Sequence, residues 1–208
     1  MRLYTYFRSS AAYRVRIALN LKGLSYESVP INLLKGEQAS EAYEAINPQK
    51  RLPTLDSGGA LLIQSPAILE YLDEVHPEPP LLPVGAVQRA KVRAVGAIVG
   101  CDIHPLNNSG TLAYLKKRFG LDQAAVDAWY AHWIVEGFAA IEPLLGPGPF
   151  AFGAKPTLAD VYLVPQVFNA RRFDVPLDAF PKITAADAAC SRLEAFRAAA
   201  PENQPDAA

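Results

Sequence analysis

A proline cluster at residues 76–83 limits how this 208-residue chain can fold. The segment reads HPEPPLLP, with four prolines. Proline has no backbone N–H, and it disfavours the helical conformation in the residue before it, so no helix can continue through the segment. The length allows one or two domains. We therefore expect an extended connector between a domain over residues 1–80 and a second domain over residues 86–208.

Before the connector, strand-like and helix-like patterns alternate. The expected elements are a strand at 3–6, a helix at 11–22, a strand at 26–31, a short helix at 40–46, hairpin strands at 54–56 and 60–64, and a helix opened by Ser65-Pro66. Serine is a favoured N-cap and proline a favoured first helical residue. This order predicts an α/β domain, a small mixed sheet with helices packed against it.

After the connector the strand patterns disappear. Helical periodicity covers residues 88–119, 122–144 and 181–199, and Thr157-Leu158-Ala159-Asp160 has the pattern of a capping box. Pro105 and Pro165 fall inside helical patterns, so we expect kinks or breaks there. We expect the Ala-rich tail after Ala198 to fray. The fold class predicted is thus an α/β domain followed by an all-α domain.

Composition excludes several classes of protein. The formal net charge is −1, from 21 acidic and 20 basic residues, which argues against a strongly basic nucleic-acid surface. No apolar run approaches the roughly 18 residues of a membrane span, and the first residues are too polar for a signal peptide. Two cysteines exclude a disulfide framework and a four-cysteine zinc site, and the three histidines lack metal-ligand spacing. We expect a cytoplasmic protein with neither metal nor nucleic acid.

Arg8-Ser9-Ser10 stands where the first strand meets the first helix, and it is the first candidate site. A helix N-terminus presents unpaired N–H groups and a partial positive charge, so it stabilises an anion. A serine hydroxyl there can donate to a thiolate or a carboxylate. The alternative is that Ser9 or Ser10 is only the N-cap.

Two further candidates follow. A cis peptide bond at Leu52-Pro53 would turn the Leu52 backbone outward to pair with an extended peptide, whereas a trans proline at a strand start is the commoner case. Gln64 and Ser65 open the next helix, where hydroxyl, N–H groups and dipole make a carboxylate site, or Ser65 is a simple N-cap. Two anion sites with a peptide-binding edge between them form a more specific combination than any one alone.

The chain closely resembles the zeta-class glutathione transferases, the family of the maleylacetoacetate and maleylpyruvate isomerases. The resemblance starts with YFRSSAAYRVRIAL at residues 6–19 and runs essentially end to end. It continues through residues 29–33, 47–49, 52–55, 64–68, 157–160, 163–167, 169–173 and Gln204-Pro205-Asp206. It implies a thioredoxin-like N-terminal domain, a helical C-terminal domain, a homodimer, and glutathione as cofactor.

The resemblance also implies residue roles. Ser9 matches the serine that hydrogen-bonds the glutathione sulfur. Arg8 and Arg172 match positions implicated in holding the carboxylates of a small dicarboxylate substrate. The remaining matches are to glutathione-binding positions: Leu52 with its backbone, Pro53 as the cis-proline, Gln64 and Ser65 at the γ-glutamyl end, and His104 as a nearby polar residue.

Two positions depart from the family pattern. Cysteine commonly follows the two serines, and here that residue is Ala11; Ser109-Gly110 stands where some maleylpyruvate isomerases carry arginines. Glutathione brings its own thiol, and lowering its pKa from about 8.5 towards 6–7 corresponds to about 2–3 kcal/mol. A hydroxyl hydrogen bond and a helix N-terminus can supply that, so we favour Ser9 over Ser10 as the activating residue.

The leading hypothesis is a glutathione-dependent cis–trans isomerase of aromatic-compound catabolism, acting by thiolate addition, rotation and elimination. The first alternative is a general transferase that conjugates or dehalogenates small α-halo acids. The second is a binding protein without activity, against which the joint presence of Ser9, Gln64, Ser65 and Arg172 argues. The sequence leaves open which maleyl compound is the main substrate.

Overall fold

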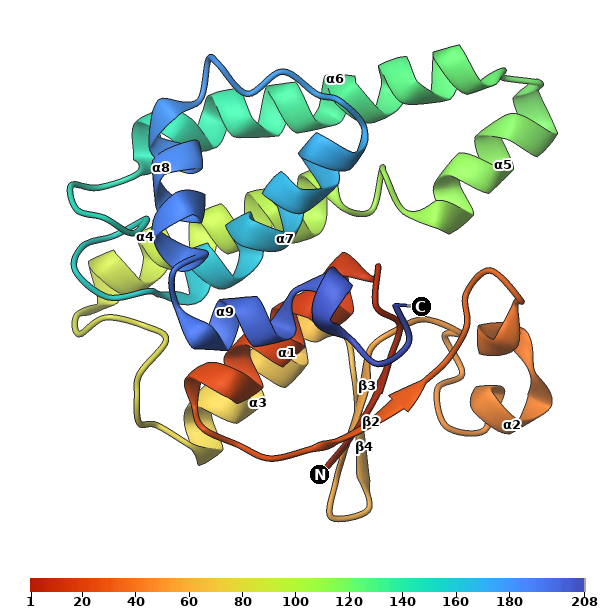
Figure 1. Ribbon diagram of the computed structural model, residues 1–208, viewed down its shortest axis with the longest axis horizontal. Coiled ribbons are helices and arrows are strands. Elements are labelled where there is room, and N and C mark those ends of the chain that lie inside the picture. The colour runs from red at the N-terminus through yellow and green to blue at the C-terminus, as the bar shows by residue number, and fades with distance from the viewer. Residues whose placement is uncertain (208) are drawn as a thin grey trace. The chain divides into compact units, whose positions relative to one another are not determined.

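The proline cluster ends one helix and separates two units of the chain in a computed structural model that describes residues 1–207 (Figure 1). The first unit comprises Met1–Pro80 and the segment from Ser191 onward, and the second comprises Leu81–Cys190. The boundary near residue 80 coincides with the expected connector. We expected the last residues to belong to the domain over 86–208. The segment from Ser191 onward makes its contacts mainly within the first unit instead. The two-domain division therefore stays a prediction.

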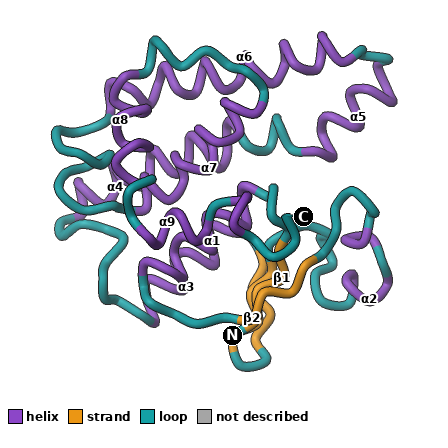
Figure 2. Tube along the Cα trace, viewed as in Figure 1, coloured by secondary structure: helices purple, strands orange, loops and turns teal. Residues whose placement is uncertain are grey.

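The first unit is built around a four-stranded sheet in the order β2-β1-β3-β4. β1 and β2 are parallel, whereas β3 pairs antiparallel with β1 and with β4. Helices α1 and α3 lie on one side of the sheet and α2 on the other (Figure 2). The elements are β1 (Arg2–Thr5), α1 (Ser10–Leu21), β2 (Glu27–Pro30), the 3₁₀ turn η1 (Glu37–Ala39), α2 (Glu41–Glu44), β3 (Thr54–Ser57), β4 (Ala60–Ile63) and α3 (Ser65–Val75). The predicted α/β fold is confirmed.

Helix α1 forms the centre of this unit. Every residue from Ser10 to Leu19 is buried, and α1 packs against both α3 and α9 (Glu194–Ala199). At its end, the buried Lys22 ammonium donates to Asp73 Oδ1 at 2.9 Å and to the carbonyls of His76 at 2.6 Å and Pro79 at 3.0 Å. Three acceptors compensate this cation for its loss of water. The lysine thereby joins α1 to the start of the connector.

The second unit is helical. Its elements are α4 (Ala86–Ala97), the π-helical turn η2 (Ile98–Ile103), α5 (Ser109–Phe119), α6 (Gln123–Ile141), the 3₁₀ turn η3 (Glu142–Leu144), α7 (Leu158–Arg172) and α8 (Pro181–Cys190). Helix α7 packs against α4 and α8, and α6 packs against η2. The capping box is confirmed: Asp160 Oδ2 accepts from the Thr157 N–H at 2.7 Å and from its hydroxyl at 3.0 Å, while Oδ1 accepts from the Ala151 N–H at 2.8 Å. No helix among the described residues is long and apolar enough to span a membrane.

The prolines act differently from one another. The pattern over 88–119 is interrupted around Pro105, where α4 and η2 end and α5 begins with Asn108 as its N-cap. Pro165 does not break α7, which continues through it to Arg172. This helix is buried along most of its length, so packing on α4 and α8 offsets the lost hydrogen bond.

The expectation that the tail frays is wrong. Residues 181–199 form two helices, α8 and α9, and a 3₁₀ turn η4 (Pro201–Asn203) follows. Ala199, Ala200 and Pro201 are buried. The Gln204 side chain donates to the carbonyls of Ala198 at 2.8 Å and Ala200 at 3.0 Å. These bonds stabilise a chain end that local helix propensity alone would leave loose.

Candidate active site

Ser9 ends the loop after β1 and is the N-cap of α1. Its Oγ accepts a hydrogen bond from the Ala12 N–H at 3.2 Å, and the residue is half-buried. A hydroxyl that accepts from the helix still has its own hydrogen to donate. The N-cap role and the role of donor to an anion are therefore compatible at Ser9. Ser10 is the first residue of α1 and only 6% exposed, so it offers little surface to a ligand.

The Leu52-Pro53 peptide bond is cis. Pairing between β1 and β3 begins at Thr54, so Leu52 lies before the paired part of the strand. Its backbone N–H and C=O take part in no ladder pair of the described strands, as binding of an extended peptide requires.

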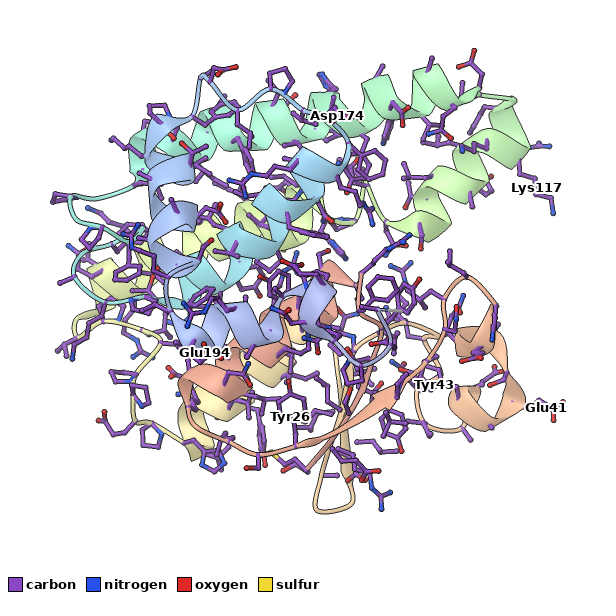
Figure 3. All side chains as sticks on the ribbon, viewed as in Figure 1. Tyr26, Glu41, Tyr43, Lys117, Asp174 and Glu194 are labelled. Atoms are coloured by element: carbon purple, nitrogen blue, oxygen red, sulfur yellow. The ribbon has the colours of Figure 1, made fainter. Side chains whose placement is uncertain are left out.

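A buried polar network fixes the turn before Leu52. The Tyr43 hydroxyl donates to the Arg51 carbonyl at 2.8 Å and lies 2.9 Å from Thr54 Oγ1 (Figure 3). Asn47 Nδ2 donates to the same two oxygens at 2.8 and 3.0 Å, and Asn47 Oδ1 accepts from the Gln49 N–H at 2.9 Å. Burial raises the pKa of Tyr43, which keeps the phenol protonated as a donor.

Gln64 and Ser65 lie at the start of α3. Gln64 has φ 69° and ψ 115°, an unusual backbone conformation for a residue with a side chain. Gln64 rather than Ser65 is the N-cap, and its side chain makes no capping hydrogen bond. It donates instead to Gln49 Oε1 at 2.5 Å. Ser65 is buried, and its Oγ accepts from Arg14 Nη1 at 3.3 Å. The N-terminus of α3 therefore keeps backbone donors for an anion.

The register of the sheet brings these three segments to the same end of the sheet, where β1 and β4 end and β3 begins. Tyr4 at the end of β1 pairs with Thr54 at the start of β3, and Thr54 pairs with Ile63 at the end of β4. Ser9 follows β1, Leu52-Pro53 precedes β3, and Gln64-Ser65 follows β4. Neighbouring strands are about 4.8 Å apart, so the three strand ends span roughly 10 Å. An extended tripeptide has about the same length.

Arg8 directly precedes Ser9, and Arg16 lies further along in α1. The two arginines differ in environment. The Arg8 guanidinium is exposed and lies 4.8 Å from the centroid of the Phe7 ring. Arg16 is fully buried in α1, and burial lowers its pKa to about 10, so it remains charged at neutral pH. Arg16 donates to the carbonyl of Phe7 at 3.0 Å and to that of Ala199 at 2.9 Å.

The other two candidate residues belong to the second unit. His104 directly follows η2 and is half-buried, and its backbone N–H donates to the Val99 carbonyl at 2.9 Å. Arg172 is the exposed last residue of α7, and its guanidinium lies 4.8 Å from the centroid of the Phe173 ring. Phe173 stacks on Tyr130 with centroids 3.7 Å apart. Burial raises the pKa of Tyr130 to about 12, so its phenol is neutral at physiological pH.

Sequence reasoning missed the residues that hold these segments in place. Asn47 and Tyr43 form the network before Leu52, Tyr130 supports the ring beside Arg172, and Asp206 accepts from the Phe7 N–H at 3.0 Å. An available signal was the pair of arginines in the otherwise apolar stretch of α1, because a buried charge requires partners. The described residues contain no His, Cys, Asp or Glu group placed to hold a metal ion.

Comparison with known proteins gives consistent results. The family profile "Glutathione S-transferase, N-terminal domain" matches residues 1–74, and "Glutathione S-transferase, C-terminal domain" matches residues 123–199. A maleylpyruvate isomerase of Ralstonia sp is 55% identical over all of both chains. The holo structure of a maleyl pyruvate isomerase, described as a zeta-class bacterial glutathione S-transferase, superposes with a TM-score of 0.98 over all of both chains at 55% identity. A maleylacetoacetate isomerase of Anaeromyxobacter dehalogenans 2CP-1, solved with glutathione in its active site, gives a TM-score of 0.90 at 45% identity, over 100% of this chain and 97% of that one.

Proposed function

The chain belongs to the zeta class of the glutathione S-transferase family, and on that premise we propose that it is a glutathione-dependent cis–trans isomerase. Its substrate is a maleyl compound, maleylacetoacetate or maleylpyruvate, and its product the fumaryl isomer. We place the enzyme in the cytoplasm, as a homodimer, in aromatic-compound catabolism. The names of its relatives favour this activity over the conjugation or dehalogenation of α-halo acids.

The observation that carries the proposal is the alignment of three candidate binding segments at one end of the sheet. The residues present fit glutathione: a hydroxyl donor at Ser9, an unpaired backbone segment at Leu52, and an uncapped helix start at Gln64 and Ser65. Pro53 is in the cis form that the family resemblance implies. We assign His104 to the same cofactor on the ground of the family resemblance alone.

Glutathione, when bound, supplies the thiolate that adds to the cis double bond and leaves after rotation about the resulting single bond. Ser9 donates a hydrogen bond that favours the thiolate over the thiol, and the α1 N-terminus adds a partial positive charge. Leu52 holds the cysteinyl part through its backbone, while the α3 N-terminus binds the γ-glutamyl carboxylate. Arg8 and Arg172 bind the substrate carboxylates, since a guanidinium can donate two parallel N–H bonds to each.

Ala11 in place of the usual cysteine is compatible with this mechanism. The residue is 8% exposed and sits inside α1, so the position contributes to helix packing more than to a ligand-facing surface. The thiol that reacts belongs to glutathione.

The test is turnover of maleylpyruvate and of maleylacetoacetate, with and without glutathione, by the wild type and by Ser9→Ala. We expect glutathione-dependent isomerisation that falls about 100-fold in Ser9→Ala, as loss of roughly 2–3 kcal/mol of thiolate stabilisation requires. Ser10→Ala is the matched comparison within the site, and we expect the smaller loss there. Ser25→Ala, at an exposed position outside the site, controls for the loss of a hydroxyl.

Three results would contradict parts of this proposal. Isomerisation that proceeds without glutathione would exclude the thiolate mechanism. Glutathione binding without isomerisation, together with turnover of an α-halo acid, would favour the conjugating transferase. A larger loss in Ser10→Ala than in Ser9→Ala would reverse the assignment of the two serines.

A further inference from the structure

The Phe7 peptide is held from both sides by two charged side chains that come from distant parts of the chain. Its N–H donates to Asp206 Oδ2 at 3.0 Å, across 199 residues of sequence. Its carbonyl accepts from Arg16 Nη2 at 3.0 Å. Phe7 lies two residues before Ser9, in the loop between β1 and α1.

Arg16 makes further hydrogen bonds to the start of this loop and to the end of β1. Besides the Phe7 carbonyl, its Nη1 donates to Thr5 Oγ1 at 3.0 Å and to the Tyr6 carbonyl at 3.4 Å. Its Nε donates to the Ala199 carbonyl at 2.9 Å. One fully buried guanidinium thus connects the loop before Ser9 to the C-terminal segment. The titratable groups whose charge acts on Arg16 are Tyr13, Tyr26 and Asp206.

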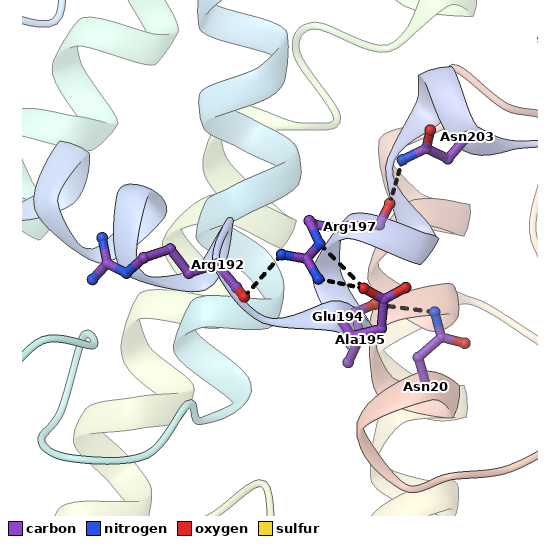
Figure 4. Close-up of polar contacts among 6 residues, drawn as sticks. All are labelled: Asn20, Arg192, Glu194, Ala195, Arg197 and Asn203. Atoms are coloured by element: carbon purple, nitrogen blue, oxygen red, sulfur yellow. Dashed lines mark hydrogen bonds and ion pairs between the residues drawn. The ribbon is translucent and has the colours of Figure 1, made fainter.

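Asp206 reaches the loop because the C-terminal segment has its own support. In Figure 4, Arg197 pairs with Glu194 and donates to the Arg192 carbonyl, while Asn203 Nδ2 donates to the Arg197 carbonyl at 2.8 Å. Asn20 of α1 donates to the Ala195 carbonyl at 3.0 Å. Gln204 donates to two carbonyls further back, as described above. The carboxylate of Asp206 is therefore presented by an ordered turn.

The loop passes this restraint on to Ser9. The Tyr6 carbonyl, which accepts from Arg16, also accepts from the Ser9 N–H at 2.9 Å. Ser9 then caps α1 with its own Oγ. Arg16 and Asp206 together hold the Thr5 hydroxyl, the Tyr6 carbonyl and both backbone polar groups of Phe7. The Tyr6 turn in turn fixes the backbone from which the Ser9 hydroxyl projects.

We propose that Asp206 and Arg16 are positioning residues for thiolate activation: they clamp the Phe7 peptide and so hold the Ser9 hydroxyl in line with the glutathione sulfur. The inference rests on the proposed function, because it assigns Asp206 a part in the reaction at Ser9. A hydrogen bond loses most of its strength when donor and acceptor are misaligned, so a loosened loop weakens the bond to the thiolate. The C-terminal segment is then part of the active-site support.

The experiment measures the thiol pKa of bound glutathione by ultraviolet absorbance against pH, together with the pH profile of kcat/KM. The test variant is Asp206→Ala, which removes the acceptor. Asp206→Asn keeps a neutral acceptor, so it is the conservative rescue. The matched control is Glu202→Ala, which removes an exposed charge of the same tail. Asn203→Ala, which loses a hydrogen bond that supports this tail, is the comparison for stability. Arg16→Lys tests the other side of the clamp.

We expect Asp206→Ala to raise the bound thiol pKa by about one unit, which lowers kcat/KM about tenfold on the acidic side of the profile. Asp206→Asn should show a smaller rise, and Glu202→Ala none. If Asp206→Ala does not fold, Arg16→Lys takes its place: a rise in the thiol pKa there supports the proposal, and an unchanged thiol pKa overturns it. Equal loss of stability in Asp206→Ala and Asn203→Ala, with the wild-type thiol pKa in both, would reduce Asp206 to a structural role.

The wild type separates failure of this inference from failure of the proposed function. A wild-type enzyme that lowers the thiol pKa and isomerises a maleyl substrate, with no change in Asp206→Ala, overturns only the clamp. A wild-type enzyme that leaves the thiol pKa at its free value overturns the proposed function, and the clamp with it.

Discussion

Ser9 and Arg172 are both proposed to contact the reactants, yet they are held in different ways. Ser9 is the cap of a buried helix, and a loop restrained by Arg16 and Asp206 leads into it. Arg172 is the exposed end of α7, and its guanidinium lies beside the Phe173 ring and the Tyr130 hydroxyl. The groups that we propose for glutathione are largely backbone groups and helix ends, whereas those that we propose for the substrate are side chains.

This difference fits what each side has to recognise. Glutathione is constant, so a site built from strand register, a cis peptide and two helix N-termini is fixed by the fold itself. A substrate differs between related enzymes, and an exposed side chain at a helix end can be exchanged without disturbing a core. We therefore expect mutations on the first side to change stability and affinity together, and mutations on the second side to change substrate kinetics alone.

The largest effect that sharpens this contrast is expected at Asn47. Asn47→Ala removes three hydrogen bonds of a buried side chain and leaves the Gln49 N–H without its acceptor, so we expect a loss of about 2–3 kcal/mol in unfolding free energy. Weaker binding of glutathione should accompany it, because the turn before Leu52 loosens. Urea unfolding and calorimetric titration measure the two quantities. Asn32→Ala, whose side-chain bonds are exposed, is the control, and an equal loss in both variants would count against the buried network.

A smaller effect, on substrate kinetics rather than on stability, is expected at Arg172. Arg172→Ala should lower kcat/KM for the dicarboxylate about 10- to 100-fold, the equivalent of roughly 1.5–3 kcal/mol, with unfolding free energy changed by less than about 0.5 kcal/mol. Its neighbour Arg171 is the matched control, because it pairs with Asp187 Oδ2 at 2.7 Å and that carboxylate is almost fully buried. Arg171→Ala should lose stability instead. Unchanged kinetics in Arg172→Ala would remove Arg172 from the site.

The smallest effect at neutral pH is expected at Tyr130. Tyr130→Phe keeps the stack on Phe173 and removes a neutral hydroxyl that interacts with Arg172, so at pH 7 stability should change little and kcat/KM should fall less than in Arg172→Ala. Burial raises the pKa of Tyr130 from 10.0 to about 12, so between these values the folded state holds a proton that the unfolded state has released. The wild type should therefore lose stability as pH rises through this window, and Tyr130→Phe should lose less. Parallel curves for the two proteins would contradict the burial of this phenol.

Much of the architecture was predictable because it follows from local chemistry. The proline cluster follows the end of α3, the Ser-Gly-Gly turn set the hairpin, and the Thr157–Asp160 spacing set a capping box. Local rules failed where packing decided. A break at Pro165 was one of the two expected outcomes, but α7 runs through it, because neighbouring helices bury it. The Ala-rich tail was expected to fray, but its residues pack with the first unit.

The sequence by itself determined the α/β and all-α division and the candidate residues at strand and helix ends, since capping, turn and periodicity rules act over a few neighbouring residues. Its resemblance to the zeta class supplied their roles. Only the tertiary structure decided that Tyr4, Thr54 and Ile63 share one row of the sheet, because strand register depends on pairing between distant segments. Only the tertiary structure brought Asp206 to the Phe7 peptide, because a buried N–H takes its acceptor from whichever segment the fold places beside it.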